Sequence, residues 1–135
     1  MSAPLLSVIA TINRRRLLDR TLASIANCAH PDGYQGAFIV ENGRRAGAEE
    51  LALEWNRRFP VTYIYLDRPS KSAALNKVLS MVGETILYFH DDDIELHPDA
   101  LMALAEAVEQ ATAPSFFGGP LRANFERTPP PWLMG

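Results

Sequence analysis

The stretch that decides the fold is "ILYFHDDD", residues 86–93, in which an apolar run is followed at once by three aspartates. Residues 86–89 are β-branched, aliphatic or aromatic, which is typical of a buried strand. The strand would therefore deliver Asp91, Asp92 and Asp93, here called the aspartate triplet, to the point where it leaves a sheet. A solvated acidic turn and a cation site are the two interpretations of such a cluster.

Three more apolar runs precede this one, and together they predict a sheet. The four runs cover residues 5–11, 37–41, 61–66 and 85–89. They are mostly continuous rather than alternating, which is typical of strands buried on both faces of a parallel sheet. A short fifth strand is predicted near Phe116 and Phe117, just before a Gly-Gly-Pro sequence.

Apolar residues at helical spacing fill the segments between these runs. The predicted helix starts are Asn13 as an N-cap, the residues behind Gly47, Ser70 or Ser72 as an N-cap, and Pro98 as a first-turn residue. Strand and helix therefore alternate four times. This alternation predicts the α/β class, with a doubly wound, mostly parallel sheet and right-handed crossovers.

Composition predicts one domain and excludes some partners. The chain has 135 residues with 47% hydrophobic content, enough for one core. Its net charge is −3 and its cations form no broad basic face, so nucleic acid is not an expected partner. A single cysteine, Cys28, in an apolar helical pattern fits a reducing cytoplasm. The N-terminal apolar run is too short for a signal peptide or a membrane span, which leaves only peripheral membrane association open.

Polar side chains follow each predicted strand. In open parallel sheets the ligand binds beyond the carboxyl ends of the strands, where the strand order reverses. The side chains expected at those ends are Thr11, Asn13, Glu41, Asn42, Asp67, Arg68 and the aspartate triplet. The carboxyl edge of the sheet is therefore the predicted binding edge.

No glycine-rich phosphate cradle accompanies these strands. The sequence "TINRRR" stands where a GxGxxG motif would follow the first strand, and no GxxxxGK[ST] motif occurs. A divalent cation held by carboxylates remains as a way to bind an anionic diphosphate, because it bridges phosphate oxygens and offsets their charge. Arg14 begins three arginines that oppose the dipole of the following helix. A nearby anion would offset this cost, and solvated arginines are the alternative.

Several segments carry a family resemblance in the same order along the chain. They are "SVIATINRRRLLDRTLASI" (7–25), "FIVENG" (38–43), "RPSKSAALNKVLSMVGETILYFHDDD" (68–93) and "IELHPDALMAL" (94–104). These segments resemble the nucleotide-sugar half of the family 2 glycosyltransferases, which are inverting enzymes of GT-A architecture. The resemblance implies a Rossmann-like donor-binding sheet and transfer of a sugar, hexosyltransferase-like, from a nucleoside-diphosphate sugar, with a UDP-sugar as the expected donor.

The resemblance also implies roles for particular residues. Thr11 and Asn13 would line the base and ribose pocket, and Glu41 stands where the family usually has an aspartate that grips the nucleoside. Lys71 would lie on the nucleotide side, and Asp91 or Asp92 would reach the ribose. The DxD pair Asp91 and Asp93 would hold Mn²⁺ or Mg²⁺. The predicted nucleotide-binding set is completed by Arg14, Asn42 and Asn76.

The predicted organisation is a donor-binding domain at residues 1–128 and an extended, proline-rich tail at 129–135. The family supplies the general base for the acceptor hydroxyl from a later segment, so no catalytic base is assigned here. We therefore expect a donor-binding half that turns over poorly or not at all alone. The acceptor is not predicted.

Two other classes of protein stay open at this point. A phosphorylatable receiver domain has a similar length and βα repeat, but it needs an acidic pair after its first strand, where this chain has "TIN". A non-catalytic module that binds nucleotide sugars or a protein partner is the other alternative, with "ERTPPPWLMG" as a docking tail.

Overall fold

The protein, described over residues 3–133 by a computed structural model, is built on a four-stranded sheet. All paired strands run parallel, in the order β3-β2-β1-β4. The elements are β1 (Leu5–Thr11), α1 (Arg15–Ala26), β2 (Tyr34–Asn42), α2 (Ala48–Trp55), β3 (Val61–Leu66), α3 (Lys71–Leu79), β4 (Ile86–His90) and α4 (Ala100–Gln110). The predicted α/β class and the four predicted strands are confirmed.

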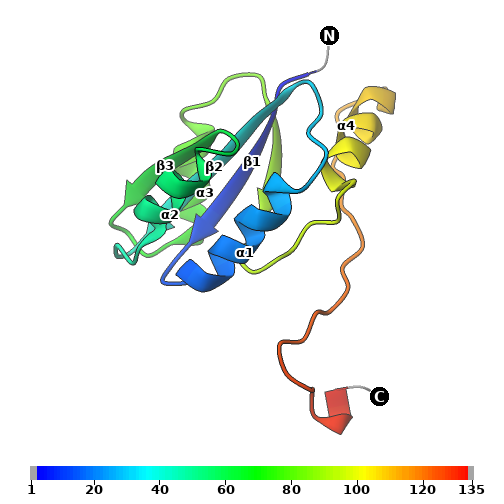
Figure 1. Cartoon of the computed structure of the whole chain (residues 1–135). Coiled ribbons are helices and arrows are strands. Elements are labelled where there is room, and N and C mark those ends of the chain that lie inside the picture. The colour runs from blue at the N-terminus through cyan, green and yellow to red at the C-terminus, as the bar shows by residue number, and fades with distance from the viewer. Residues whose placement is uncertain (1–2, 134–135) are drawn as a thin grey trace.

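Helices cover both faces of this sheet, as predicted (Figure 1). On one face α1, α2 and the start of α4 enclose a core that includes Ile9, Leu22 and Leu101. On the other face α3 packs through Ala74 and Val78 against β1 and β2. Every residue of the central strand β1 is buried, which is why apolar residues predominate in it on both faces of the sheet. The two outer strands β3 and β4 are only partly buried.

Strand β2 begins three residues earlier than the apolar pattern predicts, because of a bulge at its start. The register of β1 against β2 shifts between Leu5 and Ser7, and Gly36 adopts a φ of +106°. A Cβ at Gly36 would lie 2.1 Å from the carbonyl oxygen of Pro60, so only glycine fits there. Gln35, a polar and exposed residue, lies within the strand at this bulge. A hydrophobicity pattern therefore does not detect the true start of β2.

Two of the predicted helix starts are wrong by one or two residues. Arg14, not Asn13, is the N-cap of α1, and no side chain caps that helix. Asn13 takes a positive φ of 52°, a conformation that asparagine tolerates better than most residues, and so forms the turn before the helix. Helix α4 starts at Ala100 rather than Pro98, because residues 98–99 form a turn in which Ala100 N donates to His97 O. The alternatives Ser70 and Ser72 are resolved in favour of Ser70, whose hydroxyl accepts from Ala73 N.

The predicted fifth strand is absent from the described residues. The chain after α4 runs away from the sheet as an extended segment (Figure 1). Phe116 is fully exposed, and no described residue pairs with this stretch as a strand, so the local β propensity of Phe116 and Phe117 has no ladder to join. A single 3-10 turn, Pro131–Leu133, follows.

The tail and the domain boundary predicted from sequence are only partly covered by the structure. Regular α/β elements end at Gln110, and residues 134–135 of the predicted tail lie outside the described residues. The boundary at residue 128 stays a prediction. Within residues 3–133, no helix combines the length and the apolar content that crossing a membrane requires.

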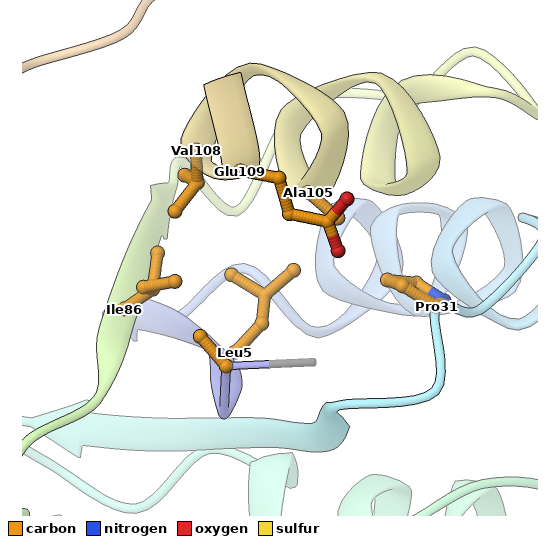
Figure 2. A pocket seen from close by; sticks show the side chains of 7 residues that line it. Leu5, Pro31, Ile86, Ala105, Val108 and Glu109 are labelled. Atoms are coloured by element: carbon orange, nitrogen blue, oxygen red, sulfur yellow. The ribbon is translucent and has the colours of Figure 1, made fainter. Parts of the chain in front are cut away.

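Figure 2 shows a small pocket at the amino ends of the strands, between β1, β4 and α4. Leu5, Ile86 and Val108 make most of its wall apolar, and Glu109 is its one charged lining residue. The pocket lies at the edge opposite the aspartate triplet, since Leu5 and Ile86 are the first residues of their strands. It offers no cluster of polar groups for chemistry.

Candidate functional site

The reversal of strand order places the candidate site between β1 and β4. The chain passes from β1 to β2 and β3 on one side, and then crosses to β4 on the other side of β1. After β1 the chain turns into helix α1, which lies on one face of the sheet. After β4 the chain continues into the aspartate triplet, next to the end of β1. Because β1 and β4 are hydrogen-bonded neighbours, the end of β1 and the triplet lie at one edge, where Thr11 Oγ1 donates to Asp92 Oδ2. Asn13 follows in the turn between β1 and α1.

Asp92 is the buried member of the triplet and anchors its loop. Its side chain is 8% exposed, and it accepts a hydrogen bond of 2.8 Å from Thr11 Oγ1. Arg14 Nη1 also lies 3.3 Å from Asp92 Oδ1. The residues after the triplet are held by α1, since Thr21 donates to Ile94 O. These contacts tie the loop after β4 to the end of β1 and to the first turns of α1.

Asp91 and Asp93 flank this anchor and point to solvent. Their side chains are 58% and 45% exposed, and each is paired with a cation of the protein. Lys71 Nζ lies 2.5 Å from Asp91 Oδ1, and Arg14 Nη1 lies 3.4 Å from Asp93 Oδ2. Arg14 is therefore paired with aspartates. This agrees with the interpretation that a nearby anion offsets its charge, and not with the alternative of a simply solvated arginine. The structure joins the two predicted metal ligands to two of the predicted nucleotide-binding residues.

Glu41 is held differently from the other predicted site residues. It is 1% exposed, and its carboxylate accepts from the backbone N–H of Ala46 at 2.9 Å and of Ala48 at 3.4 Å. The hydroxyl of Tyr63 donates to the other oxygen at 2.6 Å. Burial, together with the Glu41 carboxylate, raises the pKa of Tyr63, so the phenol stays protonated. Glu41 thus caps the start of α2 and fixes the loop after β2.

Asn42 and Asn76 occupy contrasting positions. Asn42 is buried at the end of β2, and its amide donates to Thr11 O at 3.0 Å, which joins the ends of β1 and β2. Asn76 is exposed on α3, five residues beyond Lys71 and so about 7.5 Å further along the helix axis. Among the described residues, no hydrogen bond joins Asn76 to the aspartate triplet.

Two arginines at this edge were not predicted as site residues. Arg44 Nη2 donates to Asn13 Oδ1 at 3.2 Å, and the guanidinium of Arg45 lies 4.1 Å from the ring centroid of Tyr65. Both lie within three residues of the end of β2, so the rule that selected Glu41 and Asn42 could have selected them. Arg44 brings a further cation to Asn13, on the side of the site away from Asp93.

His90, the last residue of β4, is buried directly beneath the triplet. Its Nε2 lies 2.8 Å from Ser7 Oγ, which is also 2.8 Å from the hydroxyl of Tyr34. Burial raises the pKa of Tyr34 to about 12, whereas the pKa of His90 is lowered to about 4. Desolvation causes the shift at His90, and the charge of Asp91 only partly opposes it. His90 Nδ1 has no partner among the described residues, so the ring is best accommodated in its neutral form.

The depressed pKa of His90 predicts a loss of stability in mild acid. As the pH falls from about 6.5, the unfolded chain binds a proton on this histidine but the folded chain does not until about pH 4. The free energy of unfolding should therefore fall by up to about 1.4 kcal/mol per pH unit across this window. Urea titrations at pH 7, 6, 5 and 4 in the presence of EDTA would measure it.

The matched controls are His90→Leu and His97→Gln. The leucine variant should show a shallower dependence than the wild type, and His97→Gln, which replaces a 77% exposed histidine, serves as the comparison outside this buried network. Equal slopes for the wild type and His90→Leu would contradict a neutral buried ring.

The donor set at this edge fits a cation that arrives with phosphate. Within residues 3–133, no three His, Cys, Asp or Glu side chains converge as a complete metal site. Mg²⁺ and similar hard cations commonly use only one or two protein carboxylates and complete their coordination with water and substrate phosphates. The exposed carboxylates of Asp91 and Asp93 satisfy that lesser requirement. They do not form a site that would hold a metal tightly by themselves.

The comparisons with solved structures show which fold this is. A Staphylococcus aureus TarS fragment, residues 1–349, superposes with a TM-score of 0.70 at 14% identity, over 79% of this chain and 32% of that one. The mannosyltransferase PcManGT from Pyrobaculum calidifontis, in complex with GDP-Man and Mn²⁺, gives 0.70 at 22% identity, over 84% and 34%. Glucosyl-3-phosphoglycerate synthase from Mycobacterium tuberculosis, with Mn²⁺, UDP-Glc and phosphoglyceric acid, gives 0.64 at 19%, over 80% and 40%. The GT-A architecture implied by the sequence resemblance is confirmed.

The chain therefore spans between about a third and two fifths of these matched chains. No curated protein sequence matches it significantly. The model of one protein family, described as "Glycosyl transferase family 2", matches residues 7–134, which is nearly the whole sequence. This match agrees with the order of motifs from the first strand to the aspartate triplet, and the chain belongs to glycosyl transferase family 2.

Proposed function

We propose that this chain is the donor-binding part of a cytoplasmic glycosyltransferase, and that it binds a nucleoside-diphosphate sugar together with Mn²⁺ or Mg²⁺. The observation that carries the proposal is the pair of exposed carboxylates, Asp91 and Asp93, on either side of the buried anchor Asp92 at the sheet's switch point. Family membership supports this assignment. So do the ligands of the similar structures, which include GDP-Man with Mn²⁺ and UDP-Glc with Mn²⁺.

The proposed roles follow from where the side chains lie. Asp91 and Asp93 would hold the metal, which, when bound, supplies positive charge that stabilises the diphosphate as a leaving group. Asp92 keeps the loop in place through Thr11. Arg14 and Lys71 are cations at the same edge and can donate to phosphate oxygens.

The nucleoside would lie toward the ends of β1 and β2. Asn13 and Arg44 border that side, and they are joined to each other by a hydrogen bond. Thr11, Asn42 and Glu41 belong to the proposed nucleoside-binding set, although Glu41 would act from beneath, through the loop that it fixes. Asn76 stays a weaker member, because it lies further along α3. A UDP-sugar is the proposed donor, and the general base and the acceptor are not assigned.

A binding experiment with the intact chain tests this function. Melting temperatures would be measured with UDP, GDP, UDP-Glc, UDP-GlcNAc and GDP-Man, each with MnCl₂ and with EDTA. A cognate nucleotide at a hundred times its Kd should stabilise the fold by about 2.7 kcal/mol in the presence of Mn²⁺, and by less with EDTA. AMP is the control and should have no effect. No stabilisation by any of the uridine or guanosine compounds would overturn the proposal.

A non-catalytic interaction module is the second candidate, because the segment after α4 exposes large apolar side chains. They include Phe116, Leu121 and Trp132. Such residues are typical of a surface that a partner covers. A flat response to every nucleotide, with stable folding, would favour this candidate.

A further inference from the structure

Each carboxylate proposed for the metal is paired with a positively charged side chain of the same chain. Lys71 lies against Asp91, and Arg14 bridges Asp92 and Asp93. These contacts cross the site between elements that are distant in sequence, since 20 residues separate Lys71 from Asp91 and 79 separate Arg14 from Asp93. The triplet is therefore not an isolated cluster of like charges, because Lys71 and Arg14 offset part of its negative charge from two sides.

Both cations stand at helix starts, where a positive charge is unfavourable. Arg14 is the N-cap of α1 and Lys71 is the first residue of α3. The positive end of a helix dipole favours anions, and an exposed charge of the wrong sign is unfavourable there. Neither helix has an acidic residue in its first turn. The anions that compensate Arg14 and Lys71 are therefore the aspartates of the loop after β4.

The Lys71–Asp91 and Arg14–Asp93 ion pairs lie at the surface, where the charged side chains can change partners. Both partners of the Lys71–Asp91 pair and of the Arg14–Asp93 pair are about half exposed or more. Exposed pairs contribute little net stability, and long flexible side chains can leave them at small cost. By contrast, Asp92 is buried and keeps its hydrogen bond with Thr11, so the loop stays anchored while its neighbours change partners.

We propose that Arg14 and Lys71 are exchangeable counter-ions, which pair with the aspartates before ligand binds and move to the diphosphate when a metal takes the carboxylates. This inference rests on the proposed function of the site. A metal ion alone must displace Lys71 from Asp91 and Arg14 from Asp93, which leaves Lys71 without its partner and Arg14 with Asp92 alone. A metal that arrives with a diphosphate gives the displaced cations new anionic partners, so nucleotide and metal each strengthen the binding of the other.

The proposal predicts effects of opposite sign when a counter-ion is removed. In Arg14→Gln and Lys71→Gln, Mn²⁺ without nucleotide should bind about three- to tenfold more tightly than in the wild type, because a competitor for the carboxylates is gone. The affinity for UDP in saturating Mn²⁺ should fall by about tenfold or more, because a phosphate partner is also gone. Free Mn²⁺ measured by electron paramagnetic resonance, and UDP binding measured by calorimetry, give the two values without any measurement of turnover.

Two further variants make the test specific. Lys77→Gln removes a cation from the last turn of the same helix as Lys71 and should change neither affinity. Arg14→Lys keeps the charge and should keep the weak binding of Mn²⁺ alone. Circular dichroism would establish that every variant is folded.

The outcomes separate the counter-ion role from the proposed function. If Arg14→Gln and Lys71→Gln weaken both affinities, or leave the affinity for Mn²⁺ alone unchanged, the two residues are static supports and the inference is overturned. If the wild type binds no UDP with Mn²⁺, the proposed function fails. In that case, tighter binding of Mn²⁺ alone by the variants would still support competition at the aspartates.

Discussion

Replacing both Asp91 and Asp93 by alanine is expected to remove the metal-dependent part of nucleotide binding while the fold stays intact. Both side chains are exposed, and their contacts are with Lys71 and Arg14 rather than with the core. Their loss should leave Mn²⁺ without protein ligands, leave Lys71 without its carboxylate partner and leave Arg14 paired with Asp92 alone. We expect the affinity for UDP in saturating Mn²⁺ to fall by roughly 100- to 1000-fold, which is several kcal/mol. Calorimetry with and without Mn²⁺ would measure the change.

The control for this prediction is Asp32→Ala. Asp32 is an exposed carboxylate before β2, at the amino edge of the sheet, so its replacement changes the net charge without touching the site. It should bind UDP and Mn²⁺ as the wild type does. If Mn²⁺ raises the affinity for UDP equally in the wild type and in the Asp91 and Asp93 double variant, the metal binds elsewhere and the prediction is wrong.

Replacing Glu41 by alanine is expected to destabilise the fold by about 4 kcal/mol, because three donors lose one buried acceptor. The donors are the backbone N–H groups of Ala46 and Ala48 and the hydroxyl of Tyr63. The two backbone groups belong to the start of α2 and to the loop before it, so that helix should fray first. Chemical denaturation would give the free energy of unfolding.

Two further variants separate the contribution of the Tyr63 hydroxyl from that of the two backbone N–H groups. Tyr63→Phe removes one donor but keeps the hydrogen bonds from the backbone N–H groups of Ala46 and Ala48 to the Glu41 carboxylate. It should lower the free energy of unfolding by about 1 kcal/mol. Glu41→Asp restores the residue that the family usually carries, but with a side chain one methylene shorter, and should fall between the other two. A loss below about 1 kcal/mol in Glu41→Ala would mean that water replaces the carboxylate at this position.

The four strands of the fold were predictable because each is a short run rich in aliphatic, β-branched or aromatic residues. The β1 sequence is apolar at nearly every position, and each strand is followed by a helix with a recognisable apolar spacing. Strand boundaries were less predictable where tertiary contacts set them. The early start of β2 depends on the bulge at Gly36 and its close approach to Pro60, which no hydrophobicity pattern contains.

The wrong predictions share a physical cause, which is that local propensity acts only when a partner is available. Phe116 and Phe117 have the composition of a strand, yet no described neighbour offers them a ladder. Asn13 is a good N-cap residue by type, but the turn that leaves β1 places it at positive φ and moves the cap to Arg14. The fourth helix likewise starts after a turn that begins at His97.

The positions of the candidate site residues at the sheet edge were more predictable than the contacts that these residues make. The rule that ligands bind at the carboxyl ends of parallel strands selected Thr11, Glu41 and the aspartate triplet from sequence alone. It could not show that Glu41 faces the start of α2, or that Arg14 reaches across to Asp93. Family membership also removes the receiver-domain alternative.

Strand β4 is an edge strand, because it stands at the end of the order β3-β2-β1-β4. One side of β4 pairs with β1, and within residues 3–133 its other side pairs with no strand. Any polypeptide that extended the sheet there would lie next to the strand that presents Asp91 and Asp93. An added strand on this side would therefore also add residues beside the candidate site.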